Sequence, residues 1–265
     1  MAYAPVVFKD LKSWVEKRRL LKRQNRTIGF VPTMGALHQG HASLLERSRR
    51  ENELTVLSIY VNPTQFDQPD DLKKYPTTLE RDIELAHAAG VDFILAPTYE
   101  QMYPDSYTYR VTENKFSTQL CGTSRAGHFD GVLSVVLKLL NLVQADRAYF
   151  GEKDFQQFKL IEGMAKAFFI ETEILPCPTV RELDGLAMSS RNVHLSPESR
   201  ATAPSFFRAL KEASTPQEAR ARLKLEGFEI DYIEDVHGRR YGAVKLGGVR
   251  LIDNIELGME HRNGP

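Results

Sequence analysis

The feature that most constrains the fold is an alternation of short apolar runs with amphipathic segments in the first hundred residues. Runs rich in β-branched and other apolar residues occupy 28–31, 54–61 and 91–96. The segments between them, at about 41–52 and 77–89, repeat apolar residues at helical spacing. The order strand, helix, strand, helix, strand favours parallel strands with helices on both faces. We therefore expect an α/β fold with a Rossmann-like, doubly wound parallel sheet.

The same kind of pattern continues along the chain, with one long interruption. Residues 98–127 show no clear period, and a stretch of this length inside a domain is typical of a lid or binding loop. The other elements expected in this part are helices at 8–24, 131–143 and 152–168 and strands at 147–151 and 170–175.

A domain boundary is expected where Pro176 and Pro178 flank Cys177. We predict a nucleotide-binding catalytic domain at 1–177 and a smaller C-terminal α+β lid domain at 178–265. The elements expected in the second domain are a polar loop at 181–192, helices near 197–213 and 216–226, and paired strands at 228–236 and 249–255.

The composition narrows the class of protein. Lys plus Arg and Asp plus Glu number 35 each in 265 residues, a balance that argues against a large nucleic-acid surface. Cys121 and Cys177 lie outside any C-x-x-C motif, which predicts buried free thiols in a reducing compartment. The charged N-terminus and the lack of a long apolar run predict no signal peptide and no membrane span. We expect a cytoplasmic protein without nucleic-acid or membrane partners.

The loop after the first strand run carries an unusual anion-binding pattern. Gly35 and Gly40 have the spacing of a P-loop, but His41 and Ala42 stand where that motif has Lys and Ser or Thr. His38 lies three residues before His41, so both imidazoles fall on one face if a helix begins here. A helix N-terminus favours a phosphate, and the two histidines are therefore candidate phosphate ligands.

Two other interpretations of this histidine pair stay open. The pair could bind zinc, although helical zinc ligands are normally spaced i,i+4 and no third ligand is near in the sequence. The pair could equally consist of ordinary loop histidines, because short motifs recur by chance.

Further polar groups follow other predicted strands or lie in the second domain. Because ligands of doubly wound sheets bind beyond the carboxyl ends of the strands, we expect these groups to meet. Lys153 could contact a phosphate, and Ser189, Ser190 and Arg191 could close over a triphosphate. Gln65 and Gln157 carry amides that suit hydroxyl groups. No Ser-His-Asp or Cys-His pattern indicates a covalent intermediate.

Six segments resemble the pantoate–β-alanine ligase family, in order and over nearly the whole chain. The H-x-G-H and M-S-S-R elements also resemble the H-I-G-H and K-M-S-K-S motifs of the wider nucleotidyltransferase superfamily. The matching segments are Pro32–His41, Tyr60–Phe66, His128–Val132, Tyr149–Gln157, Asp184–Asn192 and Arg250–Asn254.

The resemblance implies a two-step ligation. Pantoate and ATP form pantoyl adenylate and pyrophosphate, and β-alanine then displaces AMP to give pantothenate. It also implies Mg²⁺ with ATP and a homodimer. The residues that it implies for catalysis are His38, His41, Lys153 and Arg191. Those implied for ATP are Met34, Gly35, Ala36, Leu37, His38, Gly40, His41, Gly151, Glu152, Lys153, Asp154, Val180, Met188, Ser189, Ser190 and Arg191.

The resemblance assigns the remaining site residues as well. Gln65 and Gln157 fall on pantoate positions, and Gln65 also borders β-alanine. Arg125 and His128 lie on a loop expected near the active site, and Asp82 is the candidate metal contact. The alternatives are another H-x-G-H nucleotidyltransferase and a non-catalytic nucleotide- or RNA-binding module.

Overall fold

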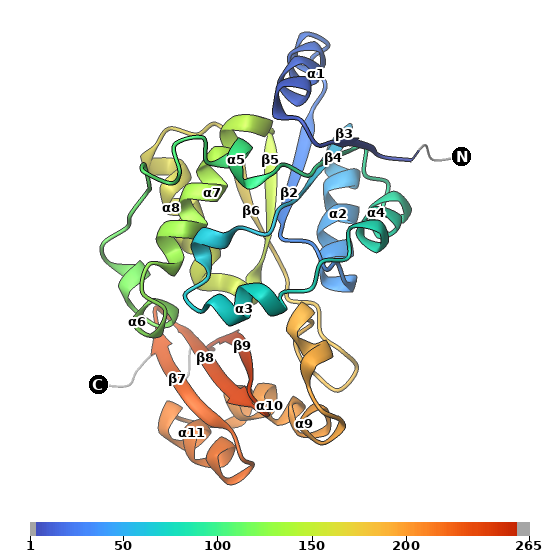
Figure 1. Ribbon diagram of the computed structural model, residues 1–265. Coiled ribbons are helices and arrows are strands. Elements are labelled where there is room, and N and C mark those ends of the chain that lie inside the picture. Colours follow the sequence, from blue (N-terminus) through green and yellow to red (C-terminus); the bar gives the residue numbers. More distant parts are fainter. Residues whose placement is uncertain (1–3, 259–265) are drawn as a thin grey trace.

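The computed structural model describes residues 4–258 and confirms the α/β fold class (Figure 1). Its six-stranded sheet is parallel throughout, in the order β1-β4-β3-β2-β5-β6. Residues 1–3 and 259–265, at the outer limits of the two predicted domains, lie outside the described residues. The strands are β1 (Val6–Phe8), β2 (Ile28–Thr33), β3 (Leu54–Ile59), β4 (Phe93–Leu95), β5 (Arg147–Gly151) and β6 (Glu173–Cys177).

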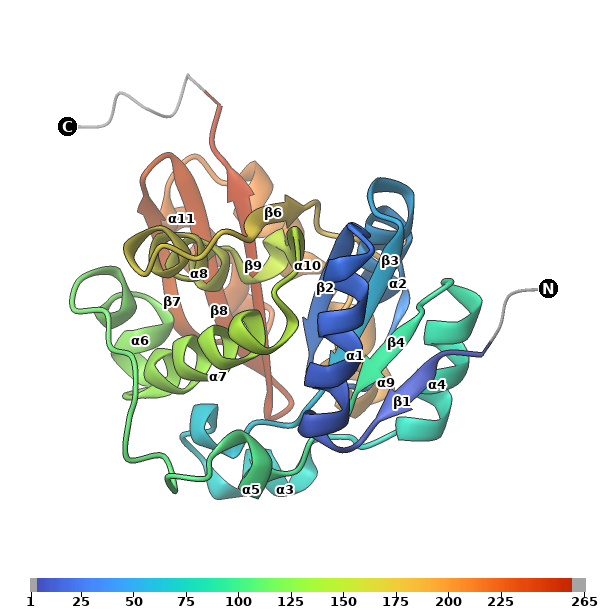
Figure 2. The same cartoon turned by 90° about the horizontal axis from the view of Figure 1, so that it is seen from above.

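Helices cover both faces of this sheet (Figure 2). One hydrophobic cluster joins the sheet to α1, α7 and α8, and another joins it to α2 and α4. The chain is therefore doubly wound, as predicted. The five long helices are α1 (Leu11–Arg23), α2 (Gln39–Glu51), α4 (Leu79–Ala88), α7 (His128–Val143) and α8 (Phe155–Ala167).

The neighbouring strands β2 and β5 separate at their carboxyl ends. β2 pairs with β3 along its whole length, but it pairs with β5 only at Gly29 and Phe30. The sequence predicts that β2 ends at Val31, whereas the strand continues through Pro32 to Thr33. Proline lacks an N–H donor, and it is tolerated here because β5 has already diverged. The divergence opens a crevice at the point where the strand order reverses, which is the usual ligand site of such sheets.

Two polar side chains of α7, Ser134 and Lys138, bind the irregular segment 98–127. Ser134 Oγ accepts a hydrogen bond from the Val111 N–H at 2.9 Å. Lys138 Nζ donates to the Met102 carbonyl at 2.9 Å and pairs with Asp105. The segment contains short helices that the sequence did not predict: α5 (Tyr99–Met102), η2 (Phe116–Thr118) and α6 (Cys121–Ser124).

The C-terminal part forms a second sheet, which is antiparallel with the order β7-β8-β9. The prediction that its outer strands pair with each other is wrong, because β8 lies between them. Arg239 and Arg240 disguise β8 in the sequence, yet Arg240 is fully buried and donates to Asp235 at 2.8 Å and to the Leu210 carbonyl. The strands are β7 (Glu229–Val236), β8 (Arg239–Leu246) and β9 (Val249–Glu256).

The small sheet packs on both faces. The helices α10 and α11 cover one face. Tyr232, Tyr241 and Ala243 on the other face join the same hydrophobic cluster as α7 and α8. The C-terminal helical elements are η4 (Ser190–His194), α9 (Pro197–Thr202), α10 (Pro204–Glu212) and α11 (Pro216–Leu225).

Other differences from the predictions have local causes. The helix expected at 197–213 is divided, because Pro204 cannot continue the hydrogen-bond ladder of α9. The first helix begins at Leu11, since residues 6–8 form the edge strand β1. The last parallel strand starts and ends later than predicted; Pro176 fits within it because β6 is an edge strand. Two short elements were not predicted, η1 (Pro63–Gln65) and α3 (Pro69–Lys74), and the helix expected at 152–168 is divided into η3 (Glu152–Asp154) and α8.

The close packing of α2 on β2 gives a testable prediction. A Cβ on Gly29 would lie 2.2 Å from Ser48 Oγ and 2.5 Å from Asn52 Nδ2. Gly29→Ala should therefore lower the free energy of unfolding by about 1–3 kcal/mol in urea denaturation. Gly163, inside α8, has open space where an added Cβ would lie. Because alanine favours a helix more than glycine does, Gly163→Ala should raise the free energy of unfolding by about 0.5–1 kcal/mol. Equal stability of Gly29→Ala and the parent would contradict the packing.

Candidate active site

The two histidines of the H-x-G-H loop form a reciprocal cap on α2. His38 is the N-cap, and its Nδ1 accepts from the Gly40 N–H at 3.1 Å. The His38 N–H in turn donates to His41 Nδ1 at 3.3 Å, and the two ring centroids are 4.1 Å apart. Because both Nδ1 atoms accept, a neutral imidazole at either position carries its proton on Nε2.

Both imidazoles are neutral at pH 7. Burial, followed by the nearby Lys153 charge, lowers the pKa of His38 to about 4. Burial, followed by His38 and Lys153, lowers the pKa of His41 to about 3. The pair therefore offers Nε2–H donors and no positive charge to an anion.

Asp82, the residue expected to contact a metal, forms hydrogen bonds with the H-x-G-H loop and with Thr78. Its carboxylate accepts from the N–H groups of Ala36 at 3.0 Å and Leu37 at 2.8 Å, and from the Thr78 hydroxyl at 3.2 Å. Asp82 is almost fully buried. The carboxylate thus anchors the loop from α4, and the two loop N–H groups expected to face ATP are used internally.

The glycines of the loop are required by its shape. Gly35 has φ +82°, a left-handed conformation that favours glycine. A Cβ on Gly40 would lie 2.8 Å from His38 Cε1. Gly40 therefore makes room for the His38 ring, a reason that its sequence position alone did not reveal.

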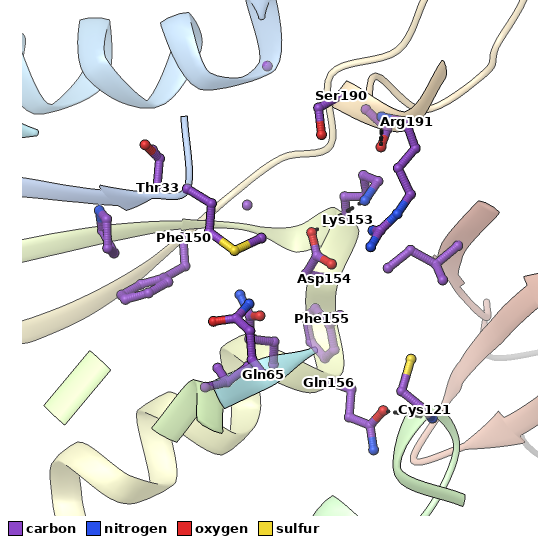
Figure 3. Close-up of a pocket in the computed structure, with 18 of the residues that line it drawn as sticks. Thr33, Gln65, Cys121, Phe150, Lys153, Asp154, Phe155, Gln156, Ser190 and Arg191 are labelled. Carbon is purple, nitrogen blue, oxygen red and sulfur yellow. Dashed lines mark hydrogen bonds and ion pairs between the residues drawn. The ribbon is translucent and has the colours of Figure 1, made fainter. Parts of the chain in front are cut away.

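Lys153 and Asp154 follow β5 on the other side of the crevice (Figure 3). Asn254 of β9 donates to the carbonyls of Glu152 at 2.8 Å and Lys153 at 2.9 Å, which fixes η3 from the small sheet. Lys153 Nζ lies 3.4 Å from Asp154 Oδ2. Burial alone would raise the pKa of the Asp154 carboxyl, but the charges of Lys153 and Arg191 outweigh it and hold that pKa below its usual range.

The Ser189–Arg191 turn approaches from the small domain. Ser189 caps η4 by accepting from the Arg191 N–H. Arg191 Nη2 forms an ion pair with Asp71 of α3 at 2.8 Å, and Tyr75, the residue after α3, lines the same cavity as Ser190. The α3 segment thus holds this turn at the edge of the cavity.

Arg125 and His128 support the backbone of Gln65. Arg125 pairs with Asp67 at 2.7 Å and donates to His128 Nε2 at 3.2 Å. His128 Nδ1 then donates to the Gln65 carbonyl at 2.7 Å. Burial, followed by the Arg125 charge, lowers the pKa of His128 to about 4, so this ring is also neutral.

One cavity brings most of the predicted residues together. Apolar side chains of α7 line it beside the polar ones. The predicted site residues on its wall are Met34, His38, Gly40, His41, Gln65, Arg125, His128, Gly151, Lys153, Asp154, Gln157, Val180, Met188, Ser189, Ser190 and Arg191. Gly35, Ala36, Leu37, Asp82 and Glu152, all in the described part of the chain, are outside this lining set.

Proteins of one family resemble this chain over nearly its whole length. The pantoate-beta-alanine ligase family profile matches residues 6–256. The pantothenate synthetase of Bdellovibrio bacteriovorus is 55% identical over 247 residues, which cover 93% of this chain and 98% of that protein. The chain belongs to the pantoate-beta-alanine ligase family. The Legionella pneumophila (strain Lens) pantothenate synthetase is 49% identical over 251 residues, 95% of this chain and 99% of its own.

Solved structures of ligases agree with this assignment. The pantoate-beta-alanine ligase of Francisella tularensis, complexed with beta-gamma ATP and beta-alanine, has a TM-score of 0.91 at 38% identity over 99% of this chain and 100% of its own. A pantothenate synthetase of Thermus thermophilus has a TM-score of 0.87 at 41% identity over 95% and 99%. The chain is therefore an enzyme that ligates pantoate and β-alanine, and the two alternative functions are set aside.

Several residues in or next to the ligase site were not predicted from the sequence. Asn62, Asp71 and Tyr75 lie beside predicted residues, while Tyr103 and Asn254 come from distant segments. The Pro69-Asp70-Asp71 sequence is a helix-start signal that could have revealed α3. Both cysteines are buried and free, as predicted.

The described residues, 4–258, lack two kinds of feature. No helix there has the length and apolar character needed to cross a membrane. No group of three or more His, Cys, Asp and Glu side chains is arranged to hold a metal ion.

The reciprocal cap predicts the tautomers of the site histidines. In the ligand-free ligase at pH 6.0, long-range ¹H–¹⁵N spectra should show His38 and His41 as neutral Nε2–H forms, whereas an imidazole with pKa about 6.5 would be mostly charged. His128 should show the opposite, Nδ1–H tautomer and serves as the internal contrast. His38→Gln and His41→Gln assign the signals. A charged or Nδ1-protonated His38 would rule out the cap as described.

Proposed function

We propose that this ligase forms pantothenate through pantoyl adenylate in the crevice between β2 and β5. A carboxylate oxygen of pantoate bonds to the α-phosphorus of ATP, and the bond to pyrophosphate breaks. The β-alanine amine then bonds to the acyl carbon and loses a proton, while the bond to AMP breaks. The observation that carries the proposal is the pair of neutral imidazoles, whose Nε2–H donors share the cavity with Lys153.

The first step needs donors for the growing charge on the phosphoryl oxygens. His38 and His41 supply fixed N–H groups, and Lys153 supplies a positive charge. Arg191, with Ser189 and Ser190, contacts the phosphates from the small domain. The remaining ATP contacts come from the other residues on the same wall, namely Met34, Gly40, Gly151, Asp154, Val180 and Met188.

The acid and the amine bind at the other end of the cavity. Gln65 and Gln157 provide amide groups for the hydroxyl and carboxylate of pantoate, and Gln65 also borders β-alanine. Phe129, Val132 and Val136 of α7 line the cavity and provide an apolar surface for the two methyl groups of pantoate.

Mg²⁺ arrives with ATP in this proposal. Bound there, it would neutralise charge on the phosphates. The Asp154 carboxylate fits such a contact because it lines the cavity and is held ionised by Lys153 and Arg191. Asp82 does not fit, since the loop N–H groups occupy its oxygens.

The resemblance to the family supports a proposal for the assembly and the location. We propose a homodimer in the cytoplasm, with residues 178–265 acting as a lid domain. The end of β6 at Cys177 supports a boundary at that point.

The adenylate mechanism makes a direct isotopic prediction. Pantoate labelled with ¹⁸O in its carboxylate should transfer one label to AMP, because the acyl C–O bond breaks in the second step. AMP and pyrophosphate should form in equal amounts only when pantoate is present, as measured by mass spectrometry and coupled assays. Formation of ADP, or unlabelled AMP, would overturn the proposed reaction.

A matched pair of lysine variants ties that chemistry to the cavity. Lys153→Ala should lower the rate of adenylation by about two to three powers of ten, as loss of a charged transition-state contact does. Lys166→Ala, in the last turn of α8, serves as the control because its side chain is 76% exposed. A Lys153→Ala rate equal to the control would remove Lys153 from the first step.

The Asp71–Arg191 ion pair competes with the proposed phosphate contact. Both side chains are about one-third exposed, so the pair is weak and replaceable. Asp71→Asn should free the guanidinium and lower KM for ATP about two- to fivefold in initial-rate kinetics. Asp70→Asn is the control, since Asp70 pairs only with exposed Lys73 on the same helix. If Asp71→Asn raises KM for ATP, the carboxylate orients Arg191 and does not compete.

A further inference from the structure

The side chain of Asn62 lies at the centre of a buried hydrogen-bond network behind Gln65. Asn62 is 1% exposed. Its Nδ2 donates to the Gly131 carbonyl at 3.2 Å and to Gln65 Oε1 at 3.0 Å. Its Oδ1 accepts from the Tyr103 hydroxyl at 2.9 Å and from Thr64 Oγ1 at 3.1 Å. Each hydrogen-bonding position of this amide therefore has a partner.

The partners fix which way both amides point. The Gly131 carbonyl can only accept, so the Asn62 nitrogen must face it. The oxygen of Asn62 then faces the Tyr103 hydroxyl, which donates to it and also contacts Thr64 Oγ1 at 3.2 Å. The second N–H of Asn62 requires an acceptor, and Gln65 turns its oxygen inward to provide one.

The orientation of the Gln65 amide decides which of its two polar groups faces the cavity. Its Nε2 donates to no other described residue between 4 and 258, and Gln65 lies on the cavity wall with Lys153 and Asp154 (Figure 3). A carboxylate or hydroxyl oxygen bound there meets N–H donors. If the Asn62 amide rotated by half a turn, Gln65 would rotate too and would present its oxygen to the anionic end of the acid.

We propose that Tyr103 is a positioning residue of the ligase, which acts through Asn62 to make Gln65 a hydrogen-bond donor to pantoate. This inference rests on the proposed pantoate contact of Gln65. Tyr103 follows α5, in the irregular segment, and it never reaches the cavity lining itself. Burial raises the pKa of Tyr103 to about 12, so its hydroxyl keeps the proton that it donates.

The tyrosine ring and its hydroxyl have separable roles. The ring packs against Tyr99 and Tyr107, with centroids 5.2 and 5.3 Å away, and Lys138 Nζ lies 4.6 Å from its centroid. Phenylalanine keeps these contacts and removes only the donor. Tyr107 provides a matched control, because its buried hydroxyl has no hydrogen-bond partner among the described residues.

The test compares single variants by initial-rate kinetics. Tyr103→Phe should lower kcat/KM for pantoate about tenfold and leave KM for ATP within about twofold, because a buried acceptor loses one of its two donors. Thr64→Val removes the other donor and should lower the same ratio about threefold. The double variant leaves the buried Asn62 oxygen without any donor, so its loss should exceed the product of the single effects and reach about a hundredfold. Tyr107→Phe should match the parent. If Tyr103→Phe matches the parent, the positioning role of Tyr103 is excluded.

A double-mutant cycle separates positioning from general structural damage. In the Gln65→Ala background, Tyr103→Phe should cause no further loss, because the residue through which it acts is gone. An equal loss in both backgrounds would show that Tyr103 acts by another route and would overturn the inference. Thr64→Val supplies the same cycle if Tyr103→Phe does not fold, as judged by thermal unfolding.

The cycle also separates this inference from the proposed function. If Gln65→Ala leaves kcat/KM for pantoate unchanged, the proposed pantoate contact is wrong and the inference fails with it. If Gln65→Ala is impaired while Tyr103→Phe equals Tyr107→Phe, only the role of Tyr103 is overturned.

Discussion

The active site depends on the separation of β2 from β5. These strands are hydrogen-bonded only at Gly29 and Phe30, and they diverge before β2 ends at Thr33. The H-x-G-H loop leaves one strand, and Lys153 follows the other. Had pairing continued, backbone hydrogen bonds would fill the space that the cavity now occupies. A proline inside a central strand is thus a consequence of the same divergence that creates the site.

A second principle organises the polar groups around this crevice. For three side chains, His38, His41 and Gln65, a hydrogen bond on the side away from the cavity decides which group faces the cavity. The Gly40 and His38 N–H groups occupy the Nδ1 atoms of His38 and His41 and leave Nε2–H outward. Asn62 occupies the oxygen of Gln65 and leaves its NH₂ outward. Donors fixed in this way need little reorganisation when charge develops on a substrate.

The small sheet is part of the site as well as a neighbour of it. One face shares a hydrophobic cluster with α7 and α8, and Asn254 fixes the backbone of η3. Arg191 forms an ion pair with Asp71 of α3, which lies on the side of the large sheet. An apolar interface therefore holds the small sheet against α7 and α8. Beside it, the partly exposed Arg191–Asp71 ion pair can be replaced by a contact with phosphate.

The sequence by itself determined the alternation of strands and helices, the doubly wound sheet and the motifs whose residues lie on the cavity wall, because periodicity and motifs are local properties of the chain. It did not reveal β8, because Arg240 suggests an exposed residue. In the structure Arg240 is buried, and Asp235 and the Leu210 carbonyl accept its hydrogen bonds. The sequence also did not reveal that the N–H groups of Ala36 and Leu37 bind the carboxylate of Asp82, which lies 46 and 45 residues further along the chain. Only the tertiary structure decided such partners, since hydrogen bonds between distant segments depend on how the elements pack.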